Sequence, residues 1–265
     1  MADGVTAFVP MLGSIDWSAP WLSDLKAIAA PILQAENWRD AFNAAARAQQ
    51  LCNHRDLPLC FVAQEELPAD MAYEEFISAN GCVPTRDNLH DFFNALVWLA
   101  YPHVKKRLNA LQATEIQQSG LARGRLRDAT TIFDENAALF VCADPELVAA
   151  LRAHRWDELF IKRRAAFSDL CHVHLFGHAL MEKLTSPYKA ITAHTWIVEV
   201  EPAFLQLSAQ AQRNNLDSIV SRQLAQGLTT SSFTPLPVLG IPDWWLQQDA
   251  AFYADQSVFR PKRSA

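Results

Sequence analysis

The chain has 265 residues, of which half are hydrophobic and a fifth are charged, so it is long enough to bury a sizeable core. Its formal net charge of -6 argues against the basic surface that nucleic-acid binding requires, and we do not expect a nucleic-acid partner. Five scattered cysteines without a Cys-x-x-Cys pair argue against a disulfide scaffold or a zinc ribbon. No window approaches the roughly 20 apolar residues of a membrane span, so we expect a cytoplasmic protein without a membrane partner.

The spacing of apolar residues predicts a mainly helical α+β protein. We expect a single domain over residues 1–265, with a core at about 17–260, a small β-hairpin or sheet, and an irregular tail rich in proline and tryptophan. In chain order, the predicted elements are helices at 21–34 and 37–50, a strand at 59–63, helices at 73–79, 87–101 and 104–118, a hairpin at 129–141, helices from 144 and at 157–184, a strand at 195–200 and a helix at 202–226.

Capping and breaking residues set several of these boundaries. The predicted helix N-caps are Ser18, Asn37, Thr85 or Asp87, and Asp144. Gly81 accepts the left-handed conformation, so it is expected to close the helix at residues 73–79. Pro102 should break or kink the run that follows residue 87, because proline cannot continue the hydrogen bonding of a helix.

The predicted helix at residues 87–101 carries the first group of candidate functional residues. Apolar residues cover most of its circumference, which indicates a helix buried on nearly all sides. Polar side chains are costly in such a helix, so His90, Asp91 and Asn94 are candidates for a function. His90 and Asn94 lie four residues apart and share one face, whereas Asp91 lies about a hundred degrees around the helix.

The predicted helix at residues 157–184 carries a second polar stripe. Cys171, His174, His178 and Glu182 follow one another at steps of three, four and four residues, which places them on one helix face. Imidazole nitrogens and carboxylate oxygens on two facing helices are the usual means by which a helical protein builds a site for zinc, iron or manganese.

His90, His178 and Glu182 are therefore the first candidate metal ligands, and His174 is the next. The alternative is that the two later histidines are hydrogen-bonded core residues and that Glu182 is a solvated residue near a helix end. The sequence contains no His-Glu-x-x-His signature that would decide between these interpretations.

Asp91 directly follows His90, as in the His-Asp pair of metal-dependent phosphohydrolases, where both residues bind the ion. Asp91 could equally bind the second imidazole nitrogen of His178 and fix its tautomer. Arg86, next to the start of the helix, is a candidate for binding an anionic group of a substrate, and Asn94 is a second candidate for substrate binding.

The predicted hairpin adds further polar residues. Asp134 or Glu135 could supply a general base or a metal ligand if the turn points at the two helices. Otherwise these two acids and Asn136 form an ordinary polar turn. Arg127 is a candidate for substrate binding, and its alternative is a structural ion pair with Asp128.

Four segments, taken together, resemble an uncharacterised bacterial family that is typical of proteobacteria, domain of unknown function 3025. They are residues 84–98, 127–136, 176–183 and 235–242. The resemblance spans nearly the whole chain, from about 17 to 260, and implies a single domain without indicating a reaction, cofactor or substrate. In that family Asn-Gly commonly forms the hairpin turn, where this chain has Asn136-Ala137.

The leading hypothesis is a metal-dependent hydrolase that acts on a small, anionic substrate. In this scheme a divalent ion lowers the pKa of bound water. The expected roles are metal binding by His90, His178, Glu182 and His174, ligand orientation by Asp91, proton acceptance by Asp134 or Glu135, and substrate binding by Arg86, Asn94 and Arg127.

Two other classes of function remain open. The second hypothesis is a non-enzymatic ligand-binding or structural protein with a buried His, Asn and Arg hydrogen-bond network. The third is a protein or nucleic-acid adaptor that uses the basic residues at 105–107 and 123–127. The sequence does not predict an oligomeric state.

Overall fold

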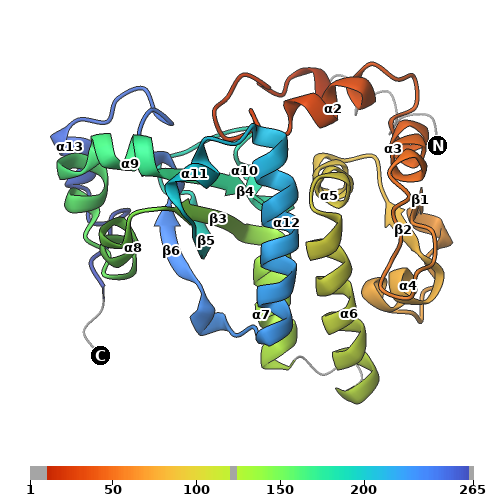
Figure 1. The fold of residues 1–265 in the computed structure, drawn as a ribbon. Coiled ribbons are helices and arrows are strands. Elements are labelled where there is room, and N and C mark those ends of the chain that lie inside the picture. The colour runs from red at the N-terminus through yellow and green to blue at the C-terminus, as the bar shows by residue number, and fades with distance from the viewer. Residues whose placement is uncertain (1–10, 120–123, 263–265) are drawn as a thin grey trace.

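The computed structural model describes residues 11–119 and 124–262. Within these ranges helices dominate and the strands form two sheets, so the prediction of a mainly helical α+β fold is confirmed. Four helices occupy the middle of the molecule, with the four-stranded sheet on one side and the two-stranded sheet on the other (Figure 1). They are α5 (Leu89–Ala100), α6 (Pro102–Ser119), α7 (Arg125–Asn136) and α12 (Ala209–Gln226).

The larger sheet has the strand order β4–β3–β5–β6. Its strands are β3 (Ala137–Cys142), β4 (Cys171–Leu175), β5 (Thr192–Glu199) and β6 (Thr234–Pro237). β3 pairs antiparallel with β4 and parallel with β5. Every residue of β3 is buried, as expected for an apolar strand that has a neighbour on both edges.

The smaller sheet consists of β1 (Cys60–Ala63) and β2 (Cys82–Thr85), which pair in parallel. A parallel pair needs a crossover, and this one includes α4 (Tyr73–Asn80). The predicted strand and helix are both confirmed. Gly81 ends α4 with φ of 71°, and a Cβ at this position would lie only 2.5 Å from Pro58 O, so the turn requires glycine.

Two predicted helix caps are confirmed. The side chain of Asn37 accepts hydrogen bonds from two backbone N–H groups at the start of α3 (Trp38–Ala48), and that of Asp144 accepts one at the start of α8 (Pro145–Arg152). These side chains satisfy N–H groups that have no partner within the helix.

The cap of α5 differs from the prediction. Asn88 caps this helix by accepting a hydrogen bond from Asp91 N, whereas Thr85 donates to Val62 O and Asp87 accepts from the Trp38 indole. The prediction of Thr85 or Asp87 as cap was therefore wrong. The prediction that the helix is buried is confirmed, because it is buried from Asp91 through to its last residue.

The predicted hairpin at residues 129–141 is wrong. Its first arm belongs to α7, and its second arm is β3, which pairs with strands that come later in the chain. The β-branched residues that suggested a strand are compatible with the helix, because the hydroxyls of Thr130 and Thr131 both donate to Arg127 O. Helix α7 brings Asp134 and Glu135 to its last turn.

The single long helix predicted at residues 157–184 is also wrong. The segment contains the π-helical turn η2 (Glu158–Lys162), α9 (Arg164–Leu170), strand β4 and α10 (His178–Lys183). Pairing of β4 with β3 replaces the helical hydrogen bonds between residues 171 and 175. His174 therefore lies on a strand, and the predicted stripe on one helix face does not exist.

Three smaller differences concern helix ends and the tail. The first predicted helix begins at α2 (Lys26–Leu33) without a cap from Ser18, and the helix predicted at residues 202–226 is divided into α11 (Pro202–Leu205) and α12. The tail, which was predicted to be irregular, contains β6 and short helices. Its Trp244 packs on Trp21, with ring centroids 6.0 Å apart. The remaining elements are η1 (Gln64–Glu66), η3 (Thr230–Ser232), η4 (Val238–Gly240) and α13 (Ala250–Tyr253).

Candidate functional site

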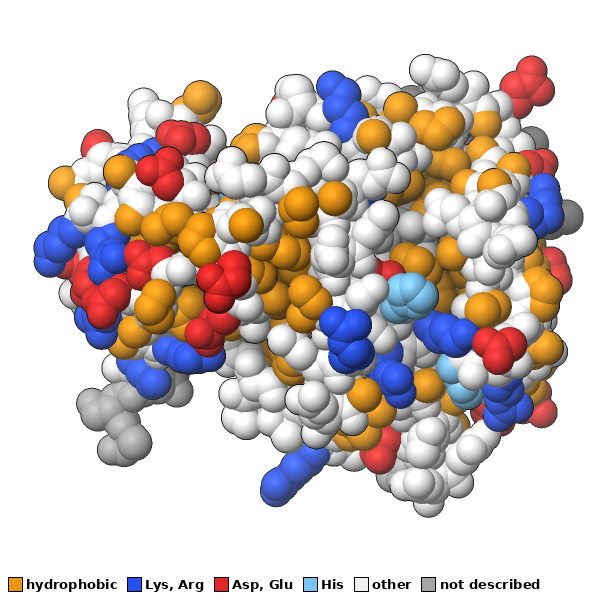
Figure 2. Space-filling model, in the orientation of Figure 1, with side chains coloured by type: hydrophobic (Ala, Val, Ile, Leu, Met, Phe, Trp, Pro, Cys, Tyr) orange, Lys and Arg blue, Asp and Glu red, His pale blue; other side chains and the backbone are white. Residues whose placement is uncertain are grey.

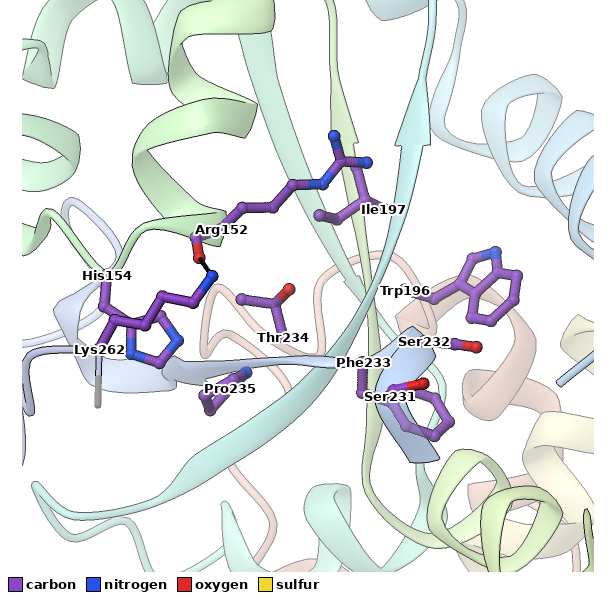
Figure 3. Close-up of a pocket in the computed structure, with 10 residues that line it drawn as sticks. All are labelled: Arg152, His154, Trp196, Ile197, Ser231, Ser232, Phe233, Thr234, Pro235 and Lys262. Carbon is purple, nitrogen blue, oxygen red and sulfur yellow. Dashed lines mark hydrogen bonds between the residues drawn. The ribbon is translucent and has the colours of Figure 1, made fainter. Parts of the chain in front are cut away.

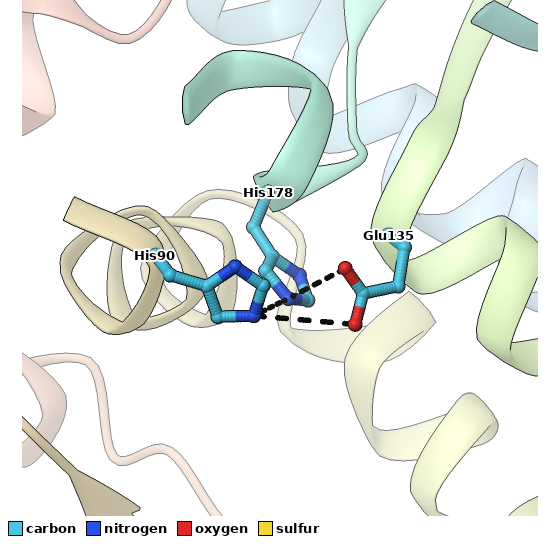
Figure 4. Close-up of side chains that lie close together, drawn as sticks. All are labelled: His90, Glu135 and His178. Carbon is cyan, nitrogen blue, oxygen red and sulfur yellow. Dashed lines mark hydrogen bonds and ion pairs between the residues drawn. The ribbon is translucent and has the colours of Figure 1, made fainter. Parts of the chain in front are cut away.

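His90, Glu135 and His178 direct three ligand atoms toward one point from three helices, α5, α7 and α10 (Figure 4). The two Nε2 atoms of the histidines lie 3.0 Å apart. The Glu135 carboxylate lies 3.7 Å from the Nε2 of His178 and 4.0 Å from that of His90. The shorter distance belongs to Oε2 and the longer one to Oε1 of Glu135, and one ligand atom from each of the three residues lies within 4.8 Å of the other two, which is the spacing of a candidate metal site.

Gly177 permits this convergence. A Cβ at this position would lie 2.5 Å from Glu135 O and 2.6 Å from Ala137 N, which is closer than packed atoms can approach. Gly177 N also donates to Ala137 O at 2.8 Å and holds the start of α10 against the end of α7. Because His178 follows Gly177 directly, this approach of two backbones places its ring beside Glu135.

A carboxylate behind the His90 ring favours an unprotonated Nε2 on that ring. His90 Nδ1 donates to Glu182 Oε2 at 3.0 Å, so its proton lies on the side away from the cluster. His178 Nδ1 lies 3.8 Å from the Asp134 carboxylate, which is beyond hydrogen-bond distance. The free Nε2 lone pair of His90 can therefore accept a hydrogen bond from His178 Nε2 at 3.0 Å or bind a cation.

Burial keeps the imidazole of His178 neutral. The residue is 3% exposed, and burial lowers its pKa to about 3 even though the charge of Asp134 acts in the opposite direction. Neutral imidazole is the form that binds a metal ion.

Lys105 supports the site from behind His178. Its ammonium donates to both oxygens of Asp134, at 2.6 and 2.9 Å, and to the side-chain oxygen of Asn94 at 2.8 Å. Burial alone would raise the pKa of Asp134, but Lys105 and then His178 outweigh burial and hold the pKa below its ordinary value. Sequence reasoning missed Lys105 in this role because the residue was counted as part of a basic surface.

Glu135 differs from Asp134 in its surroundings. Burial raises the pKa of Glu135 above its ordinary value, an effect that His90 opposes and Asp134 reinforces. A carboxylate with a raised pKa is a better proton acceptor near neutral pH than the ion-paired Asp134.

A cavity of about 260 Å³ opens beside the cluster and is lined by all three of its members. The three predicted substrate-binding residues, Arg86, Asn94 and Arg127, also line it. The side chain of Arg86 is 59% exposed, so part of its guanidinium is open to solvent. The cavity is therefore polar, and its lining combines the two arginines and two histidines with the carboxylates of Glu74, Asp91, Asp134 and Glu135.

Asp91 binds Arg86 and does not orient His178. Its carboxylate accepts from the backbone N of Arg86 at 2.6 Å and from the guanidinium at 2.9 and 3.1 Å. The second nitrogen of His178 faces Asp134 instead. Asp91 thus fixes the side chain of Arg86 beside the cavity. Asn94 accepts a hydrogen bond from Lys105 and donates one to the Tyr73 hydroxyl at 2.9 Å.

Glu182 and His174 lie outside the converging set. Glu182 contacts the Nδ1 of His90, on the opposite side of that ring from the cluster. His174 lines a separate cavity of about 500 Å³, where its Nδ1 lies 2.7 Å from Asp24 Oδ2. The prediction of a ligand stripe containing both residues fails because His174 is on β4.

Another cavity, of about 550 Å³, lies over β5 and β6 (Figure 3). Its charged lining residues are Arg152 and Lys262, and Lys262 Nζ donates to Arg152 O at 3.1 Å. Among its lining residues there is one imidazole, His154, and no carboxylate, so this larger cavity does not offer the donor set of the His90 cluster.

The predicted basic stretches do not form one surface. Lys105 is buried against Asp134, and Lys106 pairs with Asp56 at 2.8 Å. Arg123 lies outside the described residues. On the face shown in Figure 2, basic side chains are interspersed with acidic ones. Lys105 and Lys106 therefore do not add free charge to a basic surface.

The comparisons with known proteins give a family without an activity. Residues 59–263 match the family model described as a protein of unknown function (DUF3025), so the chain belongs to this family. The match includes every residue of the converging cluster. No curated protein and no solved structure matched the chain. In the part of the chain that the structure describes, no helix has both the length and the apolar character needed to cross a membrane.

Proposed function

We propose that this protein is a metal-dependent hydrolase of a small, anionic substrate. The observation that carries the proposal is the approach of two Nε2 atoms to 3.0 Å, with Glu182 hydrogen-bonded behind the His90 ring and Glu135 completing the set. Imidazole nitrogens with a carboxylate suit zinc, manganese or iron. With the proton of each ring on Nδ1, both Nε2 atoms would be free to hold the ion.

The proposed ligands are His90, Glu135 and His178. Glu182 would orient the His90 ring through its Nδ1, as carboxylates behind metal-binding histidines do, and the Asp134 carboxylate lies 3.8 Å from the Nδ1 of His178. Glu182 is thus proposed as an orienting residue and Glu135 as a ligand, which their positions relative to the two Nε2 atoms support.

The adjoining cavity supports a catalytic site over a purely structural one. Three protein ligands would leave a coordination position open, and all three proposed ligands line the cavity of about 260 Å³. Its size restricts the substrate to a small molecule or a small end group. Arg86 and Arg127 favour a negatively charged group, which we take to be a phosphate ester.

A divalent ion at this point would act as a Lewis acid and lower the pKa of water. The residues of the chain then have separate tasks. Arg86, held by Asp91, binds the substrate charge, and Asn94 and Lys105 fix the polar wall of the cavity. Glu135 would help to hold the ion and, because its pKa is raised, would also be the proton acceptor for a water molecule at the site.

The test uses p-nitrophenyl phosphate and bis(p-nitrophenyl) phosphate with protein loaded with zinc, manganese or iron. We expect metal-dependent release of nitrophenol that is lost in Glu135→Gln and retained in Glu199→Gln, a change in an exposed ion pair outside the site. Equal rates in the wild type and in Glu135→Gln, or rates unaffected by removing the metal, would contradict the proposal.

The second candidate is a non-enzymatic ligand-binding or structural protein. It is favoured by the buried network in which Lys105 joins Asp134 to Asn94 and Asn94 donates to Tyr73. In this case the His90 and His178 rings share a proton in place of a metal ion. Addition of zinc, manganese or iron would then leave the midpoint of thermal unfolding unchanged.

A further inference from the structure

Cys60 and Cys82 form a pair of thiols in the small sheet. They are direct partners in the parallel register of β1 and β2, and their Sγ atoms lie 3.1 Å apart. Neighbouring strands are about 4.8 Å apart, which lies within the roughly 4.4–6.8 Å range of Cα separations in disulfides. The two sulfurs can therefore form a bond without displacement of either strand.

A second cysteine pair in the chain provides a comparison. Cys142 and Cys171 are partners in the register of β3 and β4, but they are only 1% and 4% exposed. Cys60 and Cys82 are both partly exposed. The fifth cysteine, Cys52, accepts a hydrogen bond from Lys106 Nζ at 3.2 Å. Only the Cys60–Cys82 pair thus combines adjacent sulfurs with access for a small oxidant.

We propose that Cys60 and Cys82 are a reversible dithiol–disulfide site that takes a peroxide as its oxidant. One sulfur attacks a peroxide oxygen and becomes a sulfenic acid, and the first molecule of water leaves. The second thiol then attacks that sulfur, which forms the S–S bond and releases the second water. The two thiols lose two electrons and two protons in total, and hydrogen peroxide gains them; a dithiol reductant reverses the change.

The reduced pair is stable without an oxidant. Burial, with the neighbouring Cys82 thiol, raises the pKa of Cys60 to about 12, so Cys60 keeps its proton at neutral pH. Either sulfur can react first, and the order does not alter the product.

The bond would close a segment that reaches the candidate functional site. Residues 60–82 contain α4, and its Tyr73 and Glu74 line the cavity beside His90. A crosslink at both ends of this segment restricts its unfolded states and stabilises the unit. The dithiol site itself does not depend on the proposed hydrolase, because none of its atoms belongs to the metal cluster.

The experiment treats the full-length, reduced protein with a small excess of hydrogen peroxide and then blocks remaining thiols with N-ethylmaleimide under denaturing conditions. Mass spectrometry of a non-reducing digest should show the Cys60 and Cys82 peptides joined, with the loss of two hydrogen atoms. Dithiothreitol should release them. Cys142 and Cys171 should be recovered as maleimide adducts.

Two variants control for the other thiols. The bond should form unchanged in Cys52→Ser, and Cys82→Ser should abolish it and leave Cys60 free for maleimide. Recovery of unlinked Cys60 and Cys82 from oxidised wild-type protein, either as maleimide adducts or as sulfonic acids, would overturn the proposal. The wild-type result decides the question even if a variant fails to fold.

Discussion

Two regions of this molecule each contain a pair of histidines and a carboxylate, but they have different geometry. At the first, His90 and His178 turn their Nε2 atoms toward each other, and carboxylates lie behind both rings. At the second, His172 and His174 lie two residues apart on β4 with ring centroids 6.3 Å apart, and their Nδ1 atoms face Gln212 and Asp24.

The difference shows that residue types alone do not define a metal site. His172 and His174 point their Nδ1 atoms at separate partners, so no common point attracts an ion. His90 and His178 lie in the first turns of α5 and α10, and this lets their two Nε2 atoms meet. Orientation set by distant chain segments therefore separates the proposed metal site from a structural histidine pair.

The largest expected effect is the response of the metal-free protein to pH. The pKa of His178 is lowered to about 3 in the folded state, whereas an unfolded histidine titrates near 6.5. As the pH falls, His178 takes up a proton in the unfolded chain before it does so in the folded protein. The contribution of His178 to the unfolding free energy is therefore fully present above about pH 6.5 and declines as the pH falls toward about 3. The loss approaches 5 kcal/mol at most, since one pKa unit corresponds to about 1.36 kcal/mol.

The second region responds in another pH window. Burial alone would raise the pKa of Asp24, but His174 outweighs burial and holds this pKa below its ordinary value of 3.8. The stabilisation that the charged Asp24 provides is therefore lost only in more acidic solution. Urea unfolding between pH 8 and 4 measures how the unfolding free energy depends on pH in the range where His178 is expected to act. His178→Gln should flatten the decline between pH 6.5 and 4, and an unchanged slope in this variant would show that His178 is not the responsible group.

The next largest effect is the loss of a proposed ligand. His178→Ala should weaken zinc binding by more than about a hundredfold, since even residues that only orient ligands are worth about 10–100-fold. His174→Ala is the matched control and should change the affinity by less than about twofold, because the two sites share no partner. Competition with a chromophoric chelator measures both constants. Similar losses in both variants would remove the distinction between the regions.

Gly177 tests how the backbone creates the site. Gly177→Ala forces the added Cβ against Glu135 O and Ala137 N, so α10 must move away from α7. We expect a loss of about 1–3 kcal/mol in unfolding free energy, as for other overpacked positions, together with weaker zinc binding. Gly13→Ala, where the Cβ has no neighbour within 4 Å, serves as the control. Unaltered zinc affinity in Gly177→Ala would contradict this role.

The smallest effect is expected at the residue behind His90. Glu182→Gln keeps the size of the side chain but removes the charge that holds the proton on His90 Nδ1. Zinc affinity should fall about tenfold, at the low end of the range for orienting residues, because the glutamate is partly exposed. Isothermal titration calorimetry measures this change. A loss as large as that of His178→Ala would indicate that Glu182 itself binds the ion.

The sequence predicted part of the site because polar residues stand out in apolar segments. His90 and Asn94 were identified in a helix that is otherwise buried, and His178 by its spacing from other polar residues. Glu135 was expected in a hairpin turn and was a candidate base or ligand only if that turn pointed at the two helices, whereas the end of α7 brings it to the histidines. Gly177 was not singled out, because only the fold reveals that its missing Cβ allows two backbones to meet.

The fold was predictable where local signals determine the structure. Asn37, Asp144 and Gly81 mark helix ends by side-chain caps or backbone freedom. Strand β4 was missed because pairing with β3, about thirty residues earlier in the sequence, outweighs the helical spacing of Cys171, His174, His178 and Glu182. Helix α7 was missed because β-branched threonines suggested a strand, although their hydroxyls bond within the helix.

The most direct test of the metal site is a crystal structure of the zinc-loaded protein with anomalous scattering measured at the zinc edge. The anomalous peak should lie about 2.1 Å from the Nε2 atoms of His90 and His178, with a Glu135 oxygen in the same coordination shell. A well-ordered site with no peak, or a peak at His174 and Asp24, would contradict the assignment.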